Sequence, residues 1–587
     1  MKKAAVAIVI IIAVVGAWAI IGRVVAPSGP PPVVAGETTL DACVPEGALT
    51  LAAQASTREM WDYFQTQDWY GRLVDLHIWQ RIAETDVWRG LIDGLGELER
   101  KSGCSVNAET VMELLGEDWA LAFYGVEAGE APRILFAARV AGRPQLLDAW
   151  ETLLQSEGTP PGTAMVDGRE ISVADIDGGT FGWVLDGDLL LFSTDAGLVS
   201  AAMAARAGDG ALGDSADYRK VHDMLPDGMA GVAYADGVRL SEELRELYVS
   251  LEPDLAGFQT SLTLQGMAAM GSVWGLYEDG MRGQGVSFVP PDMPWAATRK
   301  AHLRGLELLP AGTVHAQAQA LDIPGMYEGL IDVEERGPVG EALAEFENET
   351  GIDIAADIMT WIGKEYGIGF VGMNLDGMFP LPQYVVYVAV EDEVAALAFL
   401  DKLESVIKLK LGAEGDDESA GSGGSGSGGG GGLRFTRGEY DGHTVISVSY
   451  PLVPLRPTVI FVEGYMFITV SEGLARSIAE VSAGEEGSVT TDEMFRRVIP
   501  GGTRDCCLIQ YYNVAEGLDM LDRLVDYAVS FGEGFAADDA DVQELLGWAP
   551  DVKELLKALK FIRASGARGA PGSDGATDMQ SITLLED

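Results

Sequence analysis

Two spacings of apolar residues occur along this chain, and together they predict a protein built from strands and helices. Short apolar runs, such as 181–185 and 189–192, flank turns made of an acidic residue and glycine. Glycine accepts the positive φ of tight hairpin turns, so this pattern predicts β-hairpins. Over 57–101 apolar residues recur every three or four positions, which predicts an amphipathic helix broken near Thr85-Asp86.

One pattern of a hairpin followed by a helix occurs twice. Phe181–Leu198 reads FGWVLDGDLLLFSTDAGL, and Pro457–Leu474 reads PTVIFVEGYMFITVSEGL. Each copy predicts two strands joined by an acid–Gly turn, at 186–187 and at 463–464, and then an Ala-rich helix. Because an isolated hairpin is marginally stable in water, each copy is expected to belong to a larger unit.

Further segments match in the same order on both sides of these hairpins. Val-Pro-Glu-Gly at 44–47 corresponds to Leu-Pro-Ala-Gly at 309–312, and Leu-Gly-Glu-Asp-Trp at 115–119 corresponds to Ile-Gly-Lys-Glu-Tyr at 362–366. Loop lengths differ between the copies, as is usual for surface connections. The sequence therefore predicts an α+β fold of two homologous repeats, each a mainly antiparallel sheet with packed helices.

These repeats predict the domain boundaries. A Pro-rich spacer at 26–42 precedes the first repeat at 43–290, and a connector at 291–307 leads to the second repeat at 308–587. The second repeat contains a Gly/Ser-rich insert at 412–432, whose composition is too polar to order itself. We interpret it as a tolerated surface insertion, since loop closure costs grow slowly with length, and a tether or partner-access loop is the alternative.

The N-terminal segment predicts a transmembrane anchor at 1–25. Residues 4–22 are uncharged and, as a helix, long enough to cross a hydrocarbon core of ~30 Å. Lys2 and Lys3 place the N-terminus in the cytoplasm and the body on the extracytoplasmic side, periplasmic or external, of the inner (cytoplasmic) membrane. A cleaved signal peptide is the alternative, because Ala-Trp-Ala at 17–19 resembles a cleavage site.

The net charge of the chain argues against some classes of binding partner. The 587 residues include 90 acidic and 40 basic side chains, for a formal net charge of −50. This excess argues against nucleic acid, whose binding depends on lysine and arginine, and against an anionic lipid surface. We interpret the acidity as favouring solubility, with a cation-binding role as the alternative.

Cysteines and tryptophans suggest structural roles. Cys43 and Cys104 both fall in the first repeat and could form one disulfide in an oxidising compartment. Cys506-Cys507 are neighbours in a predicted strand, where two buried small hydrophobes are expected rather than a redox pair.

A tryptophan stripe within 57–101 is interpreted as core, because each ring buries a large apolar area, and a ligand platform is the alternative. The stripe comprises Trp61, Trp69, Trp79 and Trp88.

Reactive motifs are missing from the sequence. The five histidines form neither HxxxH nor HExxH, and there is no GxSxG elbow or Walker-type phosphate loop. We therefore predict no catalytic, cofactor-binding or metal-binding residue, no cofactor and no enzymatic activity.

The repeated motifs together resemble a known family. The Val-Pro-Glu-Gly and Leu-Pro-Ala-Gly strand starts, the Gly-(Glu/Lys)-(Asp/Glu)-aromatic step, an Asp-Gly strand and the Asp-Gly-Asp-Leu-Leu hairpin carry the resemblance. The family consists of bacterial envelope proteins, known from cyanobacteria and other bacteria, and is catalogued only as a domain of unknown function. The resemblance implies two tandem copies from about residue 43 to the C-terminus and one N-terminal anchor. It implies no catalytic residue, and Cys43, Cys104 and the insert lie outside its pattern.

The sequence thus predicts an envelope-anchored binding or scaffold protein without catalytic activity. Its partners would be the membrane, through the N-terminal helix, and a protein of the cell envelope, with no nucleic acid. A ligand or partner is expected between or beside the repeats, since pockets favour domain interfaces. The alternatives are an extracytoplasmic hydrolase with a site dispersed over loops and a cation-responsive acidic surface protein.

Overall fold

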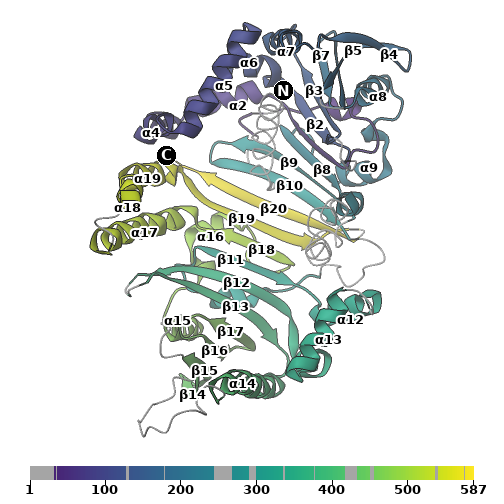
Figure 1. Ribbon diagram of the computed structural model, residues 1–587. Coiled ribbons are helices and arrows are strands. Elements are labelled where there is room, and N and C mark those ends of the chain that lie inside the picture. Colours follow the sequence, from purple (N-terminus) through teal and green to yellow (C-terminus); the bar gives the residue numbers. More distant parts are fainter. Residues whose placement is uncertain are drawn as a thin grey trace. The chain divides into compact units, whose positions relative to one another are not determined.

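The computed structural model has mixed helices and strands, with extensive antiparallel sheet and many helices (Figure 1). It describes residues 32–586 apart from 35, 127–130, 177–178, 244–267, 290–298, 335–337, 376, 378, 417–432, 450–454, 536–539 and 574. The predicted anchor, much of the spacer and most of the predicted insert lie outside the described residues. Within the described part, no helix combines the length and the apolar character needed to cross a membrane.

The chain divides into two compact units. Unit 1 comprises residues 1–290, 550–562 and 576–587, and unit 2 comprises 291–549 and 563–575. The C-terminal strand therefore belongs to unit 1, where it pairs with Gly280–Phe288. The boundaries expected for two homologous repeats stay a prediction.

In unit 1 the strands pair antiparallel in the order β4-β5-β6-β7-β3-β2-β1-β8-β9-β10-β20. The strands are β1 (Thr50–Gln54), β2 (Trp119–Phe123), β3 (Ile134–Arg139), β4 (Gly162–Val166), β5 (Arg169–Ile176), β6 (Gly179–Asp186), β7 (Leu189–Ser193), β8 (Gly231–Asp236), β9 (Ala269–Tyr277), β10 (Gly280–Phe288) and β20 (Ala576–Leu585). The helices are η1 (Leu40–Cys43), α2 (Thr57–Gln65), α3 (Asp68–Val74), α4 (His77–Ala83), α5 (Asp86–Ser102), α6 (Ala108–Leu115), α7 (Gln145–Ser156), α8 (Ala196–Arg206), η2 (Leu212–Asp214), α9 (Ala216–His222), α19 (Ala549–Ala558) and η7 (Leu559–Phe561).

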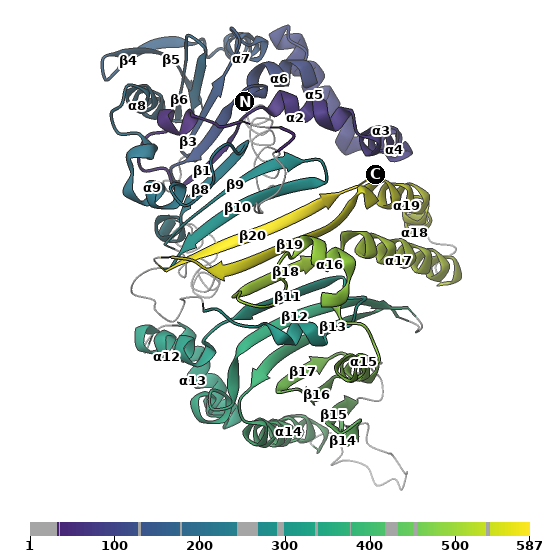
Figure 2. The ribbon, with the colours of Figure 1, turned by 180° about the vertical axis from the view of Figure 1, so that it is seen from behind.

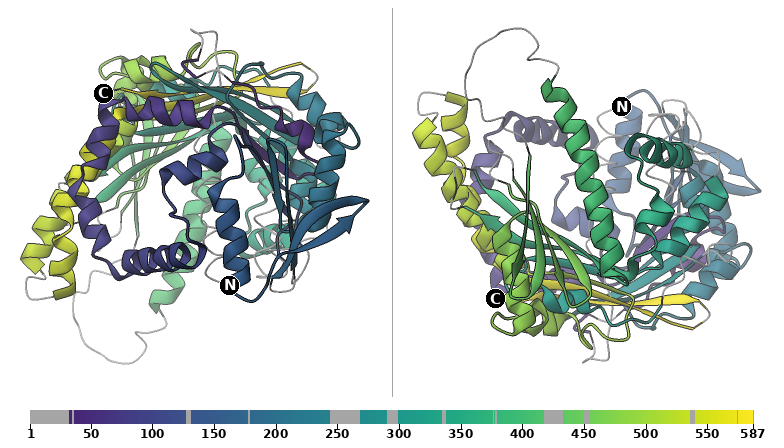
Figure 3. Two further views of the ribbon diagram at one scale, coloured as in Figure 1. Left: turned by 90° about the horizontal axis from the view of Figure 1, so that it is seen from above. Right: turned by 90° about the horizontal axis from the view of Figure 1, so that it is seen from below.

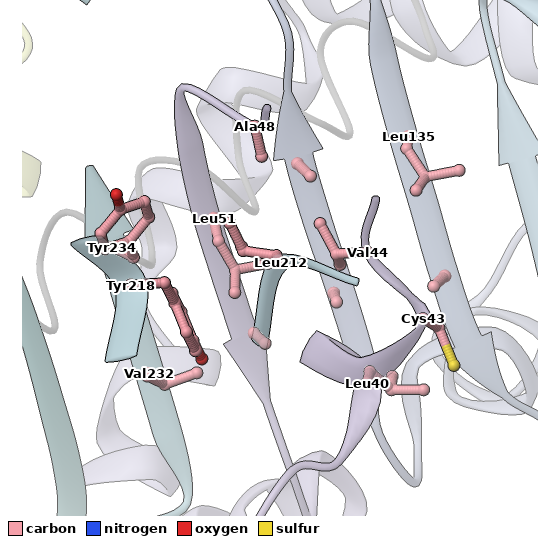
Figure 4. Packing of buried hydrophobic residues seen from close by; sticks show 14 of the residues in the cluster. Leu40, Cys43, Val44, Ala48, Leu51, Leu135, Leu212, Tyr218, Val232 and Tyr234 are labelled. Carbon is pink, nitrogen blue, oxygen red and sulfur yellow. The ribbon is translucent and has the colours of Figure 1, made fainter. Parts of the chain in front are cut away.

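The main core of unit 1 lies on one face of its sheet. Side chains alternate between the faces of a strand, so Leu51 of β1 and Leu135 of β3 point to the same side. Figure 4 shows Leu40 of η1, Leu212 of η2 and Tyr218 of α9 packed over them. All five are at most 2 % exposed, so the short helices close this core.

The predicted helix over 57–101 is divided into α2, α3, α4 and α5. The expected break at Thr85 is confirmed, because its side chain caps α5 by accepting a hydrogen bond from the Trp88 N–H. The core interpretation of the tryptophan stripe is wrong for Trp79 and Trp88, which are 46 % and 39 % exposed. Both lie where the helices bury few residues, and α4 buries only Ile78 among its described positions.

In unit 2 the antiparallel order is β14-β15-β16-β17-β13-β12-β11-β18-β19. The strands are β11 (His315–Ala320), β12 (Ile362–Asn374), β13 (Leu381–Val390), β14 (Arg434–Tyr440), β15 (His443–Ser449), β16 (Thr458–Val462), β17 (Tyr465–Thr469), β18 (Leu508–Tyr512) and β19 (Ile562–Pro571). The helices are η4 (Arg304–Leu308), α12 (Ile323–Glu334), α13 (Pro338–Thr350), the π-helical η5 (Ile354–Ile358), α14 (Glu393–Asp416), α15 (Glu472–Ala483), η6 (Val489–Thr491), α16 (Glu493–Val498), α17 (Val514–Phe535) and α18 (Ala540–Leu546).

Helices cover the unit 2 sheet through aromatic and aliphatic contacts. The long helix α14 (Figure 3) packs Ala396 and Phe399 against Trp361 and Met466. Helix α15 lies beside β16 and β17 (Figure 2). Trp361 is 2 % exposed, which makes it a central contributor to this second core.

The strand order of unit 2 repeats the first nine positions of the order in unit 1. Equivalent backbone contacts also recur, since the Leu212 N–H donates to the Val44 carbonyl at 2.7 Å and the Val489 N–H donates to the Leu309 carbonyl at 2.9 Å. The hairpin turn at 463–464 forms where it was predicted. Its counterpart occupies 187–188, one residue later than predicted, because Asp186 still pairs with Leu189.

Candidate functional site

A buried carboxyl group lies beside η4 in unit 2. Glu365 of β12 is only 5 % exposed. It accepts hydrogen bonds from the Tyr465 hydroxyl at 2.5 Å, the Gly305 N–H at 2.9 Å and the Arg304 N–H at 3.1 Å. The carboxyl group therefore ties the first turn of η4 to the sheet.

The charge of this carboxyl group is disfavoured. Burial raises the pKa of Glu365, and the hydrogen bonds from Tyr465 and the η4 backbone only partly oppose that effect. The side chain of Arg304 is used elsewhere, because it pairs with Glu463 at 2.7 Å. The fully buried Tyr387 hydroxyl lies close to the Glu365 carboxyl group. Burial, and then the neighbouring Glu365 charge, hold the pKa of Tyr387 well above its usual value.

Glycines make room for the Tyr387 ring. A Cβ at Gly305 would lie 2.0 Å from Tyr387 Cε2, and one at Gly367 would lie 2.4 Å from Cζ. Both distances are far below van der Waals contact, so any larger residue would displace the ring. Because Gly305 and Gly367 have no side chain, η4 and β12 can both approach the Tyr387 ring closely.

The corresponding acid of unit 1 has a cation beside it. Asp118 stands in the motif at 115–119 that matches 362–366, and its carboxylate lies 3.4 Å from Arg139 Nε. Burial raises the pKa of Asp118, although Arg139 acts against it. The same guanidinium lies 3.1 Å from Asp188. An acid at this position is thus paired in unit 1 and surrounded by neutral donors in unit 2.

A second acid stands on η4 and faces outward. Glu307 Oε1 accepts a hydrogen bond from the Thr503 hydroxyl at 2.6 Å and lies 2.6 Å from His302 Nε2. Burial opposes ionisation of Glu307, but the contacts with Thr503 and His302 outweigh it and lower its pKa. Glu307 is therefore a carboxylate, and its Oε1 makes both of these contacts within the protein.

A cavity of about 350 Å³ opens next to this acid, and we call it the η4 cavity. It is lined by Glu307, Thr490, Phe495, Arg496, Ile499, Gly501, Gly502, Thr503 and Arg504. The loop at 501–504 turns with positive φ at Gly501 and Gly502, a conformation that favours glycine. Arg568 of β19 fixes this loop by donating hydrogen bonds to the carbonyl groups of Gly502 at 3.2 Å and Arg504 at 2.6 Å.

Several donors at the η4 cavity are unused. Within the part of the chain that the structure describes, the Arg504 guanidinium has no hydrogen-bond or ion-pair partner. The backbone N–H groups of Gly501, Thr503 and Arg504 likewise have no partner there. The cavity therefore presents positive charge and free donors together.

Unit 1 has a smaller cavity at the corresponding place, between η1 and the loop after α9. Its volume is about 20 Å³, and its lining includes Glu37, Asp41 and Asp227. Tyr218, at the third position of α9, donates to Asp41 Oδ2 at 3.3 Å and helps to close it. In unit 2 the corresponding residue is Phe495, at the third position of α16, and it has no hydroxyl group with which to make such a contact. The two cavities thus differ in volume and in the sign of the charge on their lining side chains.

The groups around the η4 cavity are poorly arranged for nucleophilic chemistry. Cys506 is fully buried, donates to the Thr503 carbonyl at 3.1 Å, and burial raises its pKa to about 11. Its thiolate is thus scarce at neutral pH. The Thr503 hydroxyl donates to a carboxylate that His302 also contacts, so the histidine does not act on the hydroxyl directly. Among the described residues, no three His, Cys, Asp or Glu side chains are grouped to hold a metal ion.

The structure does not join Cys43 to Cys104. Both are buried free thiols. The pKa of each is raised, first by burial, but the charged neighbours differ: Arg206 and Arg139 act on Cys43, whereas Glu113 acts on Cys104. A disulfide between them under oxidising conditions stays a prediction.

Sequence reasoning did not find the η4 cavity. Its lining comes from 307 and from 490–504, which no short motif connects. Glu365 did carry a signal, because it stands in the step that recurs at 115–119. That signal indicated a repeated structural feature and not a site.

Comparisons with known proteins assign the family. Two solved structures, described as crystal forms III and I of TP0453, match with 6 % identity and TM-scores of 0.22 and 0.23. The matches cover 45 % and 44 % of this chain and 82 % and 81 % of those chains. No curated protein matches. The model of DUF3352, a family of proteins of unknown function, matches residues 111–414, more than half of the sequence, and the chain therefore belongs to that family.

Proposed function

We propose that this protein is a non-catalytic binding protein whose unit 2 takes a small anionic ligand in the η4 cavity. The observation that carries the proposal is the unpartnered guanidinium of Arg504 at a cavity of about 350 Å³. In a chain with a net charge of −50, carboxylates to pair with an arginine are abundant. An arginine left free beside a cavity is therefore suited to an anion supplied from outside.

The donor set fits an anion with several oxygens. Arg496 and Arg504 line the cavity, and a guanidinium group matches the geometry of carboxylate and phosphate oxygens. The free N–H groups at 501, 503 and 504 add neutral donors. A volume of about 350 Å³ is within the ordinary range for small-molecule sites.

The side chains beside the η4 cavity favour binding of a ligand without its chemical conversion. The Thr503 hydroxyl donates to Oε1 of Glu307, which His302 also contacts, and Cys506 is buried and protonated at neutral pH. Neither the threonine hydroxyl nor the thiol is thus activated as the nucleophile that a hydrolase requires. These contacts favour binding over the hydrolase alternative.

The proposal includes the duplication and the membrane attachment inferred from the sequence. The common strand order of β1–β9 and β11–β19, and the paired contacts at Val44 and Leu309, support an internal duplication. The uncharged stretch at 4–22 supports an N-terminal anchor with the body on the extracytoplasmic side, where an envelope protein could be a partner. Membrane fractionation and protease accessibility of intact cells test this attachment.

A thermal-shift panel on the full chain tests the binding proposal. The probes are pyrophosphate, inorganic phosphate and malonate at constant ionic strength, with chloride as the reference. A ligand of the folded state raises the melting temperature with its concentration by mass action. We expect a saturable rise with at least one probe, while ³¹P or ¹H NMR shows the probe unchanged after prolonged incubation. Equal melting temperatures across the panel, or turnover of a bound probe, would contradict the proposal.

A further inference from the structure

A second cavity, in unit 1, has the opposite character, and we call it the aromatic cavity. Its volume is about 250 Å³. Helix α2 and the start of α3 form one side, and the turn between β9 and β10 together with the end of β20 forms the other. The lining residues are Tyr63, Phe64, Gln67, Trp69, Leu276, Tyr277, Glu278, Asp279, Gly280, Leu585 and Glu586.

The aromatic side chains of this cavity are held in place by one another. Trp69 stacks on Phe561 of η7, with ring centroids 4.1 Å apart and planes 4° apart. The centre of the Phe64 ring lies 5.6 Å from that of Trp69 and 6.3 Å from that of Tyr63. The backbone N–H of Glu586 donates to the Phe561 carbonyl at 2.8 Å, which fixes the C-terminal segment beside the rings.

The charged residues of the lining are all acidic. Asp279 is paired with Arg282, whose guanidinium donates to both of its oxygens at 2.7 and 2.8 Å. The Arg282 guanidinium also lies 4.9 Å from the centre of the Tyr277 ring, so this ring already makes a cation–π contact within the protein. Glu278 is exposed, and its carboxylate has no partner among the described residues. The aromatic cavity thus has an unpaired negative charge next to its aromatic rings.

We propose that the aromatic cavity binds a small organic ammonium cation. The faces of aromatic rings attract cations, most strongly those that are weakly hydrated, such as quaternary ammonium groups. The Glu278 carboxylate supplies the complementary charge at the rim. A hard metal ion is a poor alternative because it requires a set of several oxygen ligands, whereas half of this lining is apolar or aromatic. This site is independent of the η4 cavity and of the function proposed for it.

Calorimetric titration of the full chain with choline and with tetramethylammonium tests this proposal. The neutral isostere 3,3-dimethylbutanol and Ca²⁺ are the comparison probes. We expect saturable binding of the two ammonium ions and at least tenfold weaker binding of the neutral isostere, about the contribution of one cation–π contact with its charge partner. Equal binding of the isostere, stronger binding of Ca²⁺ or no saturable heat with either ammonium ion would overturn the proposal.

Two variants connect the binding to the aromatic cavity. Trp69→Ala is expected to weaken choline binding about tenfold by removing an aromatic wall. Because that change could also loosen α3, Glu278→Gln is the second variant, and it should weaken binding about threefold. Glu170→Gln, at an exposed position of β5 that is distant in sequence, is the charge-matched control and should bind as the wild type does. Unchanged affinity in both cavity variants would overturn the assignment.

The ammonium group could belong to a free amine or to a lipid headgroup. Co-sedimentation with phosphatidylcholine vesicles, reversed by free choline, would identify the lipid as the source. Choline binding without vesicle binding would identify a free amine. Either result agrees with the proposed class of ligand.

Discussion

The hydroxyl group of Tyr465 donates a 2.5 Å hydrogen bond to Glu365, a buried carboxyl group with which no lysine or arginine pairs among the described residues of unit 2. In unit 1 the corresponding acid, Asp118, has Arg139 beside it. The same sheet position therefore holds an acid among neutral donors in one unit and beside a guanidinium group in the other, and burial raises the pKa of both acids. The raised pKa of Glu365 makes the stability of unit 2 sensitive to pH in a definite direction.

Replacing Glu365 by glutamine should remove part of the pH dependence of stability. Burial raises the pKa of Glu365 above its unfolded value near 4.5, so the folded state holds the proton more tightly. That contribution is fully present below the unfolded pKa and is lost as pH rises through the folded pKa. Urea unfolding between about pH 4 and 8 should show wild-type stability falling relative to E365Q as pH rises. The exposed control Glu391→Gln should keep the wild-type slope, and a constant difference for E365Q would contradict this prediction.

Gly305→Ala should destabilise the protein. The added Cβ would approach Tyr387 Cε2 to 2.0 Å, which requires the ring or η4 to move. Overpacking of this kind costs about 1–3 kcal/mol in the free energy of unfolding. The matched control is Gly312→Ala, where nothing lies within 4 Å of the added atom. Equal chemical denaturation midpoints for the two variants would show that the ring is not confined as described.

Thiol labelling should distinguish free cysteines from a disulfide. Cys43, Cys104, Cys506 and Cys507 are buried and free, and burial raises the pKa of the first three. We expect little alkylation of the folded protein at pH 8 and four labelled thiols after unfolding without reductant, read by intact mass. Two labelled thiols would indicate a bond, and peptide mapping would show whether it joins Cys43 to Cys104.

Two tryptophans should differ sharply in their contribution to stability. Trp361 is 2 % exposed and donates to the Asp357 carbonyl at 2.7 Å, so Trp361→Ala should cost about 3–5 kcal/mol. Trp79 is 46 % exposed, and Trp79→Ala should cost less than about 1 kcal/mol. Denaturant unfolding of the two variants checks the contrast. A loss of similar size in the two variants would contradict this prediction.

The sequence predicted the hairpins and the order of elements well, because acid–Gly turns and apolar periodicity are local signals. It failed for Trp79 and Trp88, since helical spacing shows that a residue lies on an apolar face but not that another element covers that face. The η4 cavity was beyond sequence reasoning for a related reason. Glu307 and Arg504 are brought together by hydrogen bonds of Thr503 with Glu307 and with Leu303, about 200 residues away in the sequence, and neither belongs to a recognisable motif.

The central claim is that the free guanidinium of Arg504 makes the η4 cavity an anion site, and calorimetric titration of pyrophosphate tests it most directly. The wild type, Arg504→Gln and the charge-matched control Arg434→Gln, at an exposed position of β14, would be compared at fixed ionic strength. We predict saturable binding to the wild type and to R434Q, and a loss of about tenfold or more in R504Q, the effect of one charge-assisted contact. Equal affinity in all three proteins, or no binding of pyrophosphate to the wild type, would contradict the claim.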